Sequence, residues 1–235
     1  MINIGIEDDK FIRGKVPMTK QEIRILTLAK AKITESDFVV DVGAGTGSLS
    51  IEAARIAARG YVFAIDKNPE AVEIITQNAE KFSVDNLVII HAEAPKGLKN
   101  VPRIDVALIG GTGGQISEIL DTVDAKLKIG GRIILNCVTV QTLANGLSWF
   151  KTHGGYKYDA IQVQINRLQN VGSYDMAKAL NPVHIVTAKK SRLKQVNNVL
   201  NFSEAKIKNV QATPQNLNVQ MGTQLSDTVA KEESL

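Results

Sequence analysis

Hydrophobic residues along the chain follow two patterns that alternate. Short apolar runs rich in β-branched residues, typical of buried strands, occupy residues 38–42, 61–66, 87–91, 104–109 and 132–138. Between most of these runs, apolar residues recur three or four positions apart, which predicts amphipathic helices. Residues 156–165 and 183–188 add two strands with no predicted helix between them, so these should pair antiparallel. We therefore expect an α/β protein with a mostly parallel, seven-stranded sheet that ends in an antiparallel strand pair.

The two ends of the chain differ from this central pattern. Thr19 is followed by Glu22, the spacing of a capping box, which predicts that the first helix begins there. After Lys190 the sequence is rich in Asn, Gln, Ser and Thr and has little periodicity. We expect one domain over residues 1–190 and a mobile polar tail over residues 191–235.

Composition narrows the class of protein. The chain has 235 residues and a net charge of +4, too mild to indicate nucleic acid by itself. The single cysteine, Cys137, permits no internal disulfide, and no Cys/His cluster suggests a metal site. No apolar run approaches the length that spans a bilayer, and the N-terminus lacks the features of a signal peptide. We expect a cytoplasmic protein with neither metal nor membrane partner.

The most informative segment lies between the first strand and the next helix, and reads Asp41-Val-Gly43-Ala-Gly45-Thr-Gly47. N–H groups at a helix start, together with the helix dipole, favour an anionic ligand group. Glycine lets such a ligand approach the backbone. A dinucleotide fingerprint, Gly-x-Gly-x-x-Gly, would need a glycine where Ser48 stands. The spacing therefore argues against a nicotinamide-dependent oxidoreductase.

An acidic residue followed by alternating glycines resembles the first motif of the class I S-adenosylmethionine-dependent methyltransferases, which have a Rossmann-like fold. In that family the loop holds the methionine end of the cofactor. A second acidic residue, at the tip of the next strand, holds the ribose hydroxyls. Asp66 ends the next predicted strand, so the resemblance implies this role for it. Asp66 also fits an acid before a helix that starts at Pro69, and the two interpretations are compatible.

Four more stretches narrow the resemblance. They read Pro17-Met-Thr-Lys20, Ala92-Glu-Ala-Pro95, Ile109-Gly-Gly-Thr-Gly-Gly114 and Ala179-Leu-Asn-Pro182. Together they are similar to the CbiT family, the precorrin-6B C15-methyltransferases that also decarboxylate their substrate in corrin (vitamin B12) biosynthesis. The similarity covers roughly residues 4–189. It implies methylation of precorrin-6B, or of its cobalt form, at C15 with loss of the carboxyl group of the ring-C acetate.

The resemblance also implies the cofactor, S-adenosylmethionine, and the partners. It places cofactor contacts at Thr19, Asp41, Gly43, Ala44, Gly45, Thr46, Gly47, Asp66, Glu93 and Ala94. The family usually has Gly-Asp-Ala where this chain has Ala92-Glu93-Ala94, so the carboxylate facing the adenine amino group would stand one methylene further out. A tetrapyrrole is the expected partner, with no nucleic acid, and a homo-oligomer, typically a tetramer, is the expected assembly.

The implied acceptor is a meso carbon that the conjugated ring already makes nucleophilic, so no strong base is needed. We expect Gly110, Gly111, Thr112 and Gly113 to let the flat macrocycle approach, although a tight turn would also explain these glycines. Many substrate carboxylates call for cations at the pocket rim. Arg13 and Lys20 are the predicted contacts, with Lys15, Arg24 and Arg167 as further members of the group. The sequence identifies no catalytic acid and does not say whether the substrate carries cobalt.

Three alternatives stay open at this stage. A tRNA adenine-N1-type methyltransferase shares much of the core, and a basic face with stacking aromatics would favour it. An isoaspartyl-type protein-carboxyl methyltransferase, another class I enzyme, shares the glycine motif. A non-catalytic protein that binds S-adenosylmethionine or a tetrapyrrole would keep the same glycines and Asp66, because binding does not prove turnover.

Overall fold

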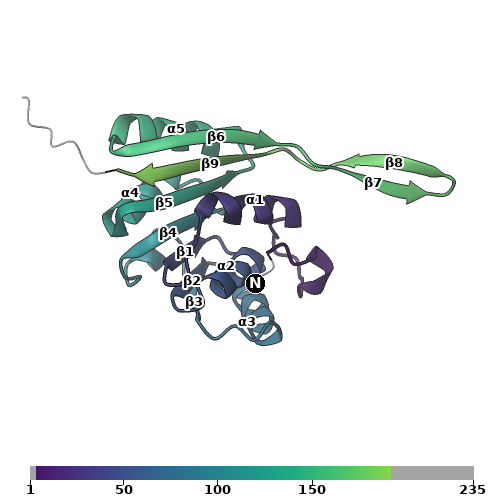
Figure 1. Ribbon diagram of the computed structural model, residues 1–235, viewed down its shortest axis with the longest axis horizontal. Coiled ribbons are helices and arrows are strands. Elements are labelled where there is room, and N and C mark those ends of the chain that lie inside the picture. Colours follow the sequence, from purple (N-terminus) through teal and green to yellow (C-terminus); the bar gives the residue numbers. More distant parts are fainter. Residues whose placement is uncertain (1–3, 192–235) are drawn as a thin grey trace, which may run out of the picture. The chain divides into compact units, whose positions relative to one another are not determined.

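The computed structural model describes residues 4–191, so the predicted tail lies outside the described residues except for Ser191. A seven-stranded sheet forms the centre of the fold (Figure 1). Five neighbouring strands are parallel, in the order β3 (Leu87–His91), β2 (Tyr61–Asp66), β1 (Phe38–Val42), β4 (Ile104–Ile109) and β5 (Leu127–Cys137). Next come β9 (Val183–Lys190), antiparallel to β5, and β6 (Tyr156–Val163), antiparallel to β9. The predicted α/β sheet with its closing antiparallel pair is confirmed.

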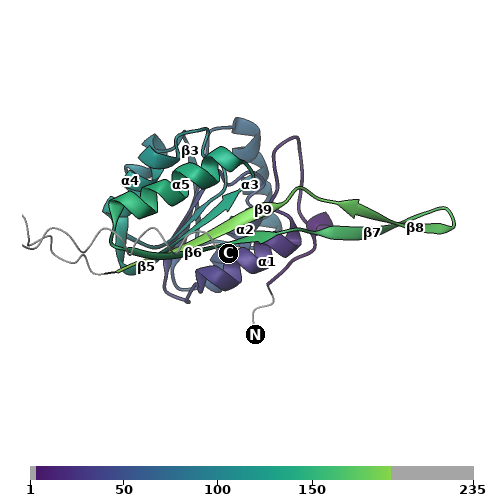
Figure 2. The ribbon, with the colours of Figure 1, turned by 90° about the horizontal axis from the view of Figure 1, so that it is seen from above.

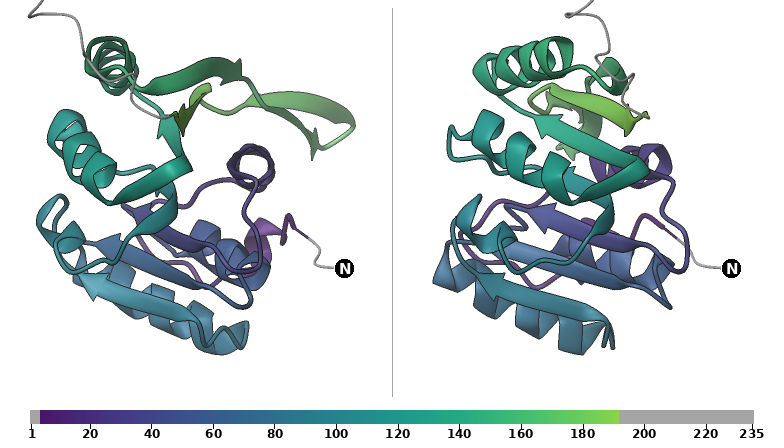
Figure 3. Two further views of the ribbon diagram at one scale, coloured as in Figure 1. Left: turned by 60° about the vertical axis from the view of Figure 1, so that its left-hand side comes forward. Right: turned by 90° about the vertical axis from the view of Figure 1, so that its left-hand side faces the viewer.

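Helices cover both faces of this sheet (Figure 3). One face carries α1 (Gln21–Ala31), α2 (Ser48–Ile56) and α3 (Pro69–Lys81), and the other carries α4 (Ile116–Lys126) and α5 (Val140–His153). Successive residues of a strand point to opposite faces. Val39 therefore belongs to the hydrophobic cluster beneath α1 and α2, and Val40 to the cluster beneath α4 and α5. Two short 3-10 helices complete the order, η1 (Asp8–Lys10) and η2 (Lys96–Leu98).

The start of α1 differs from the prediction. The helix begins after Lys20, which is the N-cap residue in an extended conformation without a side-chain cap, so the capping box at Thr19 was wrong. The Thr19 carbonyl instead accepts a hydrogen bond from Arg24 Nη1 at 2.6 Å. Arg24 is fully buried and pairs with Asp8 Oδ1 at 3.0 Å and Glu52 Oε1 at 2.7 Å. Its place at the pocket rim was therefore also wrong, because two buried carboxylates hold it inside.

A hairpin that was not predicted extends away from the sheet (Figures 1 and 2). It consists of β7 (Asn166–Val171) and β8 (Tyr174–Ala179), which form a separate two-stranded antiparallel sheet. Every residue of both strands is exposed, so the apolar-polar alternation that marks a half-buried strand is missing. The usable signal was the pair Gly172-Ser173, a two-residue hairpin connection in which Gly172 has a φ of +65°.

The helices are short compared with the thickness of a bilayer. Even α5 has only 14 residues, whereas a transmembrane helix needs about 20. Within the part of the chain that the structure describes, no helix is both long enough and apolar enough to cross a membrane.

Candidate active site

A cavity of about 670 Å³, the main cavity of the site, lies at the carboxyl ends of the parallel strands. Ligands of open α/β sheets bind at this edge, next to the point where the strand order reverses. Here that point lies between β1 and β4. The predicted site residues that line the cavity are Thr19, Lys20, Gly43, Ala44, Gly45, Asp66, Glu93, Ala94, Gly110, Gly111, Thr112 and Gly113.

The first glycine loop is held in place by backbone hydrogen bonds. The N–H groups of Gly43 and Ala44 both donate to the Ile65 carbonyl, at 2.9 and 3.2 Å. Gly45 has a φ of +58°, and a Cβ on it would overlap with the Pro17 carbonyl oxygen. A residue with a side chain is disfavoured there both by the left-handed backbone and by this neighbour. Glycine at this position is therefore required by the close approach of the N-terminal segment.

Asp66 connects this loop to the end of β2. Its Oδ2 accepts a hydrogen bond from Gly45 N at 2.9 Å, and its Oδ1 accepts one from Asn68 N at 2.9 Å. The side chain lines the cavity, and each carboxylate oxygen has a second lone pair. The carboxylate is thus fixed by two backbone N–H groups and can still accept hydrogen bonds from a diol.

Three of the predicted cofactor residues lie behind the loop and do not line the cavity. Asp41 is buried and accepts a hydrogen bond from Ser50 Oγ at 2.5 Å. Burial, with a contribution from the charge of Asp66, raises the pKa of Asp41 to about 6. The carbonyl of Thr46 accepts from Asn78 Nδ2 at 2.9 Å, and Gly47 is the N-cap residue of α2. Asp41, Thr46 and Gly47 therefore hold the loop in place from the side away from the cavity.

A charged pair at the edge of the cavity involves Glu93. Its carboxylate accepts a hydrogen bond from Lys67 Nζ at 2.9 Å, and this bond lowers the pKa of Glu93. Glu93, Lys67 and the neighbouring Ala94 all line the cavity. Sequence reasoning named Glu93 and Ala94 but missed Lys67, which directly follows the acidic residue at the tip of β2.

The second glycine loop packs against the first. The N–H groups of Gly110 and Gly111 donate to the Val42 carbonyl at 3.0 and 3.2 Å. A Cβ on Gly43 would overlap with the backbone of Gly111, so the two loops touch at their glycines. A Cβ on Gly110, in contrast, would meet only the Gly43 carbonyl oxygen, at 4.0 Å. Space beside Gly110 therefore belongs to the cavity and is not filled by the protein.

The remaining wall comes largely from the late part of the chain and was mostly missed. It contains Ile23 from α1, Asn136 and Val138 at the end of β5, and Leu180, Asn181 and Val183 near the start of β9. Leu180 and Asn181 belong to the stretch Ala179-Leu-Asn-Pro182, which contributed to the family resemblance, so the sequence could have predicted that they line the cavity. Arg13 is not part of the lining, and its Nε donates to the Asp8 carbonyl at 3.1 Å.

The side chains of the cavity are those of an organic ligand site. Across residues 4–191, no group of three or more His, Cys, Asp or Glu residues has the arrangement to hold a metal ion. What the cavity offers is a fixed carboxylate, backbone loops and an apolar wall, which suit an organic ligand with hydroxyl groups.

Comparison with known proteins identifies the family. The family described as "Precorrin methyltransferase domain" matches residues 10–190. The chain belongs to the precorrin methyltransferase family. The resemblance expected from the sequence is thereby confirmed, and with it the assignment as an enzyme.

Individual precorrin methyltransferases support this membership. A curated relative from Sulfurisphaera tokodaii, named "Probable cobalt-precorrin-6B C(15)-methyltransferase (decarboxylating)", is 41% identical over 189 residues, covering 79% of this chain and 97% of that protein. The crystal structure of a precorrin-6y C5,15-methyltransferase from Geobacter metallireducens is 40% identical, with a TM-score of 0.75 over 80% of this chain and 98% of that chain.

One alternative from the sequence concerned RNA methylation. A tRNA (m1A58) methyltransferase from Aquifex aeolicus is also similar in structure, with a TM-score of 0.63 over 77% of this chain and 72% of that chain. Its sequence is only 15% identical, so the likeness shows a shared class I methyltransferase fold and no more. The family assignment therefore rests on the similarity to precorrin methyltransferases alone.

Proposed function

We propose that the protein transfers a methyl group from S-adenosylmethionine to C15 of precorrin-6B, or of its cobalt form, and releases the carboxyl group of the ring-C acetate as carbon dioxide. The observation that carries this proposal is the Asp66 carboxylate, fixed by Gly45 N and Asn68 N inside the cavity of a precorrin methyltransferase. A cavity of about 670 Å³ lies within the range of small-molecule and cofactor sites. The localisation in the cytoplasm stays a prediction from the sequence.

The donor set of the cavity fits this cofactor. Asp66 would accept hydrogen bonds from the ribose hydroxyls, and the loop from Gly43 to Gly45 would lie along the methionine end. When bound, the cofactor supplies an electrophilic methyl group, which a carbon nucleophile takes in an in-line displacement. The chain's task is therefore alignment and exclusion of water more than acid–base chemistry.

The protein's own groups suit that task. Ile23, Ile65 and Val183 give the cavity an apolar wall, against which a conjugated ring can lie. An apolar wall also desolvates a carboxylate held near it, which favours loss of carbon dioxide. The electron pair of the broken C–C bond passes into the ring's π system, and a proton then replaces the lost carboxyl group. The open space beside Gly110 leaves room for a flat substrate close to the cofactor loop.

Cofactor binding provides the first test. Isothermal titration with S-adenosylhomocysteine should give micromolar binding to the full chain. We expect Asp66→Ala to weaken it about tenfold to hundredfold, because hydrogen bonds to a charged group contribute about 1.5–3 kcal/mol. Asp66→Asn keeps an acceptor for the loop and should retain the fold. Asp85→Ala removes an exposed aspartate that does not line the cavity and serves as the control.

Turnover provides the second test. Precorrin-6B and its cobalt form are each incubated with the wild-type protein and S-adenosylmethionine, and carbon dioxide and methylated product are measured. Release of carbon dioxide in an amount equal to the methylated product, from either substrate, supports the proposal. Binding of S-adenosylhomocysteine without methylation of either substrate would indicate a non-catalytic protein, and absence of binding would contradict the cofactor site.

We also propose that the protein forms a homo-oligomer, a tetramer by its family resemblance, through the β7–β8 hairpin. Large apolar side chains are exposed on this hairpin, with Leu168 76%, Tyr174 74% and Met176 56% exposed. Apolar groups gathered on a protruding element favour contact with another chain. Sedimentation of Tyr174→Lys should show smaller particles than the wild type. Ile129→Lys, at an exposed apolar residue of β5, should leave the particle size unchanged.

A further inference from the structure

A second hollow of about 330 Å³ lies at the base of the hairpin, beside the main cavity. Its lining consists of Lys20, Arg167, Leu168, Gln169, Lys178 and Leu180. Lys20 and Leu180 also line the main cavity, so the two hollows adjoin along these residues.

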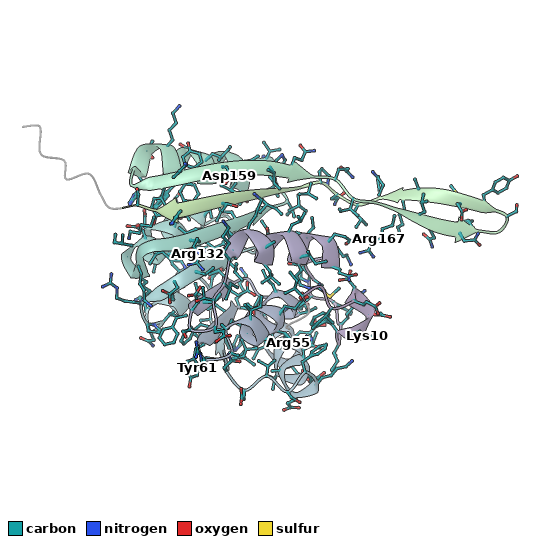
Figure 4. The ribbon with its side chains drawn as sticks, viewed as in Figure 1. Lys10, Arg55, Tyr61, Arg132, Asp159 and Arg167 are labelled. Carbon is teal, nitrogen blue, oxygen red and sulfur yellow. The ribbon has the colours of Figure 1, made fainter. Side chains whose placement is uncertain are left out.

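The charges in the second hollow are unbalanced. Arg167 and Lys178 stand directly opposite each other in the hairpin, an arrangement in which like charges repel. Figure 4 shows Arg167 at the base of the hairpin. Its charge is compensated, because it donates to both carboxylate oxygens of Glu22 at 2.7 and 3.1 Å and lies 3.6 Å from Asp8. Lys20 and Lys178 form no ion pair within the described part of the chain. Two lysines that line the hollow are thus left without a carboxylate partner.

Repulsion between opposite strands does not define a site by itself. Lys157 in β6 stands opposite Lys189 in β9 in the same way, and neither residue lines either hollow. The hairpin base differs from that pair because it combines two lysines without carboxylate partners and a hollow that shares Lys20 and Leu180 with the main cavity. The pair in the main sheet therefore provides a matched control.

We propose that the second hollow binds a peripheral carboxylate of the substrate while the conjugated ring occupies the main cavity. Lys20 and Lys178 are the charge partners of that carboxylate, and Leu180 contacts its methylene groups. Arg167, held by Glu22 and Asp8, fixes the base of the hairpin against α1. This inference rests on the proposed function, and it makes the hairpin base a determinant of specificity for acidic macrocycles.

Binding of uroporphyrin, a tetrapyrrole whose rim carries acetate and propionate groups, tests the inference without turnover. Fluorescence titration of the full chain at low and at moderate salt should show salt-sensitive binding. We expect Lys178→Glu to weaken it about tenfold, because the charge is reversed, and Lys157→Glu to change it less than about twofold. Lys178→Gln should give an intermediate loss and a weaker salt dependence.

Two results would overturn the inference. One is equal binding by the wild type and Lys178→Glu, and the other is an equal loss in Lys178→Glu and Lys157→Glu, which would reflect overall charge. Titration with S-adenosylhomocysteine and sedimentation of each variant measure whether the cofactor site and the assembly, to which the hairpin is proposed to contribute, are retained. A failure of the proposed function would appear separately, as wild-type protein that binds uroporphyrin through Lys178 yet methylates neither form of precorrin-6B.

Discussion

Two glycine-rich loops meet at the centre of the candidate site, and their glycines have different causes. In the first loop a Cβ on Gly43 or Gly45 would overlap with backbone atoms. In the second loop a Cβ on Gly110 has a single neighbour at 4.0 Å, and one on Gly114 has none within 4 Å. Packing within the protein requires Gly43 and Gly45, whereas Gly110 borders open space in which we propose that the ligand lies. Gly111 belongs with the packed glycines, because its Cβ would lie 3.1 Å from Gly43 Cα, so the proposed ligand role concerns Gly110.

The largest effect is expected in the first loop, for Gly45→Ala. A residue with a Cβ in a left-handed conformation costs roughly 1–2 kcal/mol, and the overlap with Pro17 adds to this cost. We expect the free energy of unfolding to fall by about 3 kcal/mol or more and S-adenosylhomocysteine binding to be lost. Urea unfolding and isothermal titration measure the two effects.

The control for this variant is Gly130→Ala. Gly130 has a φ of +82°, and a Cβ on it would have no neighbour within 4 Å, so only the backbone cost should appear. If both variants unfold at the same urea concentration, the packing argument for the first loop fails.

The second loop should respond in activity and not in stability. Gly110→Val places a side chain in the open space of the cavity, where no protein atom lies closer than 4.0 Å to its Cβ. We expect methyl transfer to fall by about tenfold or more, while the free energy of unfolding changes by less than about 0.5 kcal/mol. Turnover assays and urea unfolding separate the two. A variant that turns over at the wild-type rate would contradict a ligand role for Gly110.

A pH effect on stability should arise from Asp41, which lies beneath the first loop. The folded-state pKa of Asp41, about 6, lies above the ordinary value of 3.8, because burial disfavours the carboxylate. The native state therefore binds more protons than the unfolded state between about pH 4 and pH 6, and stability from this group declines as the pH rises through that range. Asp41→Asn cannot ionise and should lack this decline, which amounts to at most about 3 kcal/mol. Urea unfolding at several pH values from about 4 to 7 compares it with the wild type; parallel curves would contradict the raised pKa.

The smallest effect is expected for Gly114→Ala. Gly114 has a φ of +87° but no neighbour within 4 Å, so the variant should cost about 1 kcal/mol of backbone energy. Thermal unfolding should shift by about 2–4 °C, with methyl transfer unchanged. A large loss of activity in Gly114→Ala would show that the whole second loop, and not Gly110 alone, contacts the ligand.

Patterns among neighbouring residues predicted the strands and loops that depend mainly on those residues. The central parallel strands were visible because strands buried on both faces are nearly continuous apolar runs, as in residues 104–109. The loop after β1 was visible because its glycines are closely spaced. The capping box at Thr19 misled, because the carbonyl of that residue is bonded to the buried Arg24.

Contacts between distant segments were not predictable in the same way. Arg24 is buried because Asp8 and Glu52 reach it from other elements. The spacing of residues within α1 does not predict these two ion pairs. Val183 lines the cavity only because β9 lies beside β5. The hairpin was missed because both of its faces are exposed, which removes the alternation that marks a strand.

The position of β9 has a consequence for synthesis on the ribosome. β6 is made before β9, yet among the strands that the structure describes its only neighbour in the main sheet is β9. Until residues 183–190 emerge, β6 has no strand to pair with, and β5 presents an open apolar edge. Open edges of this kind template association between chains. We therefore expect prematurely released chains to aggregate, and the yield of folded protein to depend on how fast β9 follows β6.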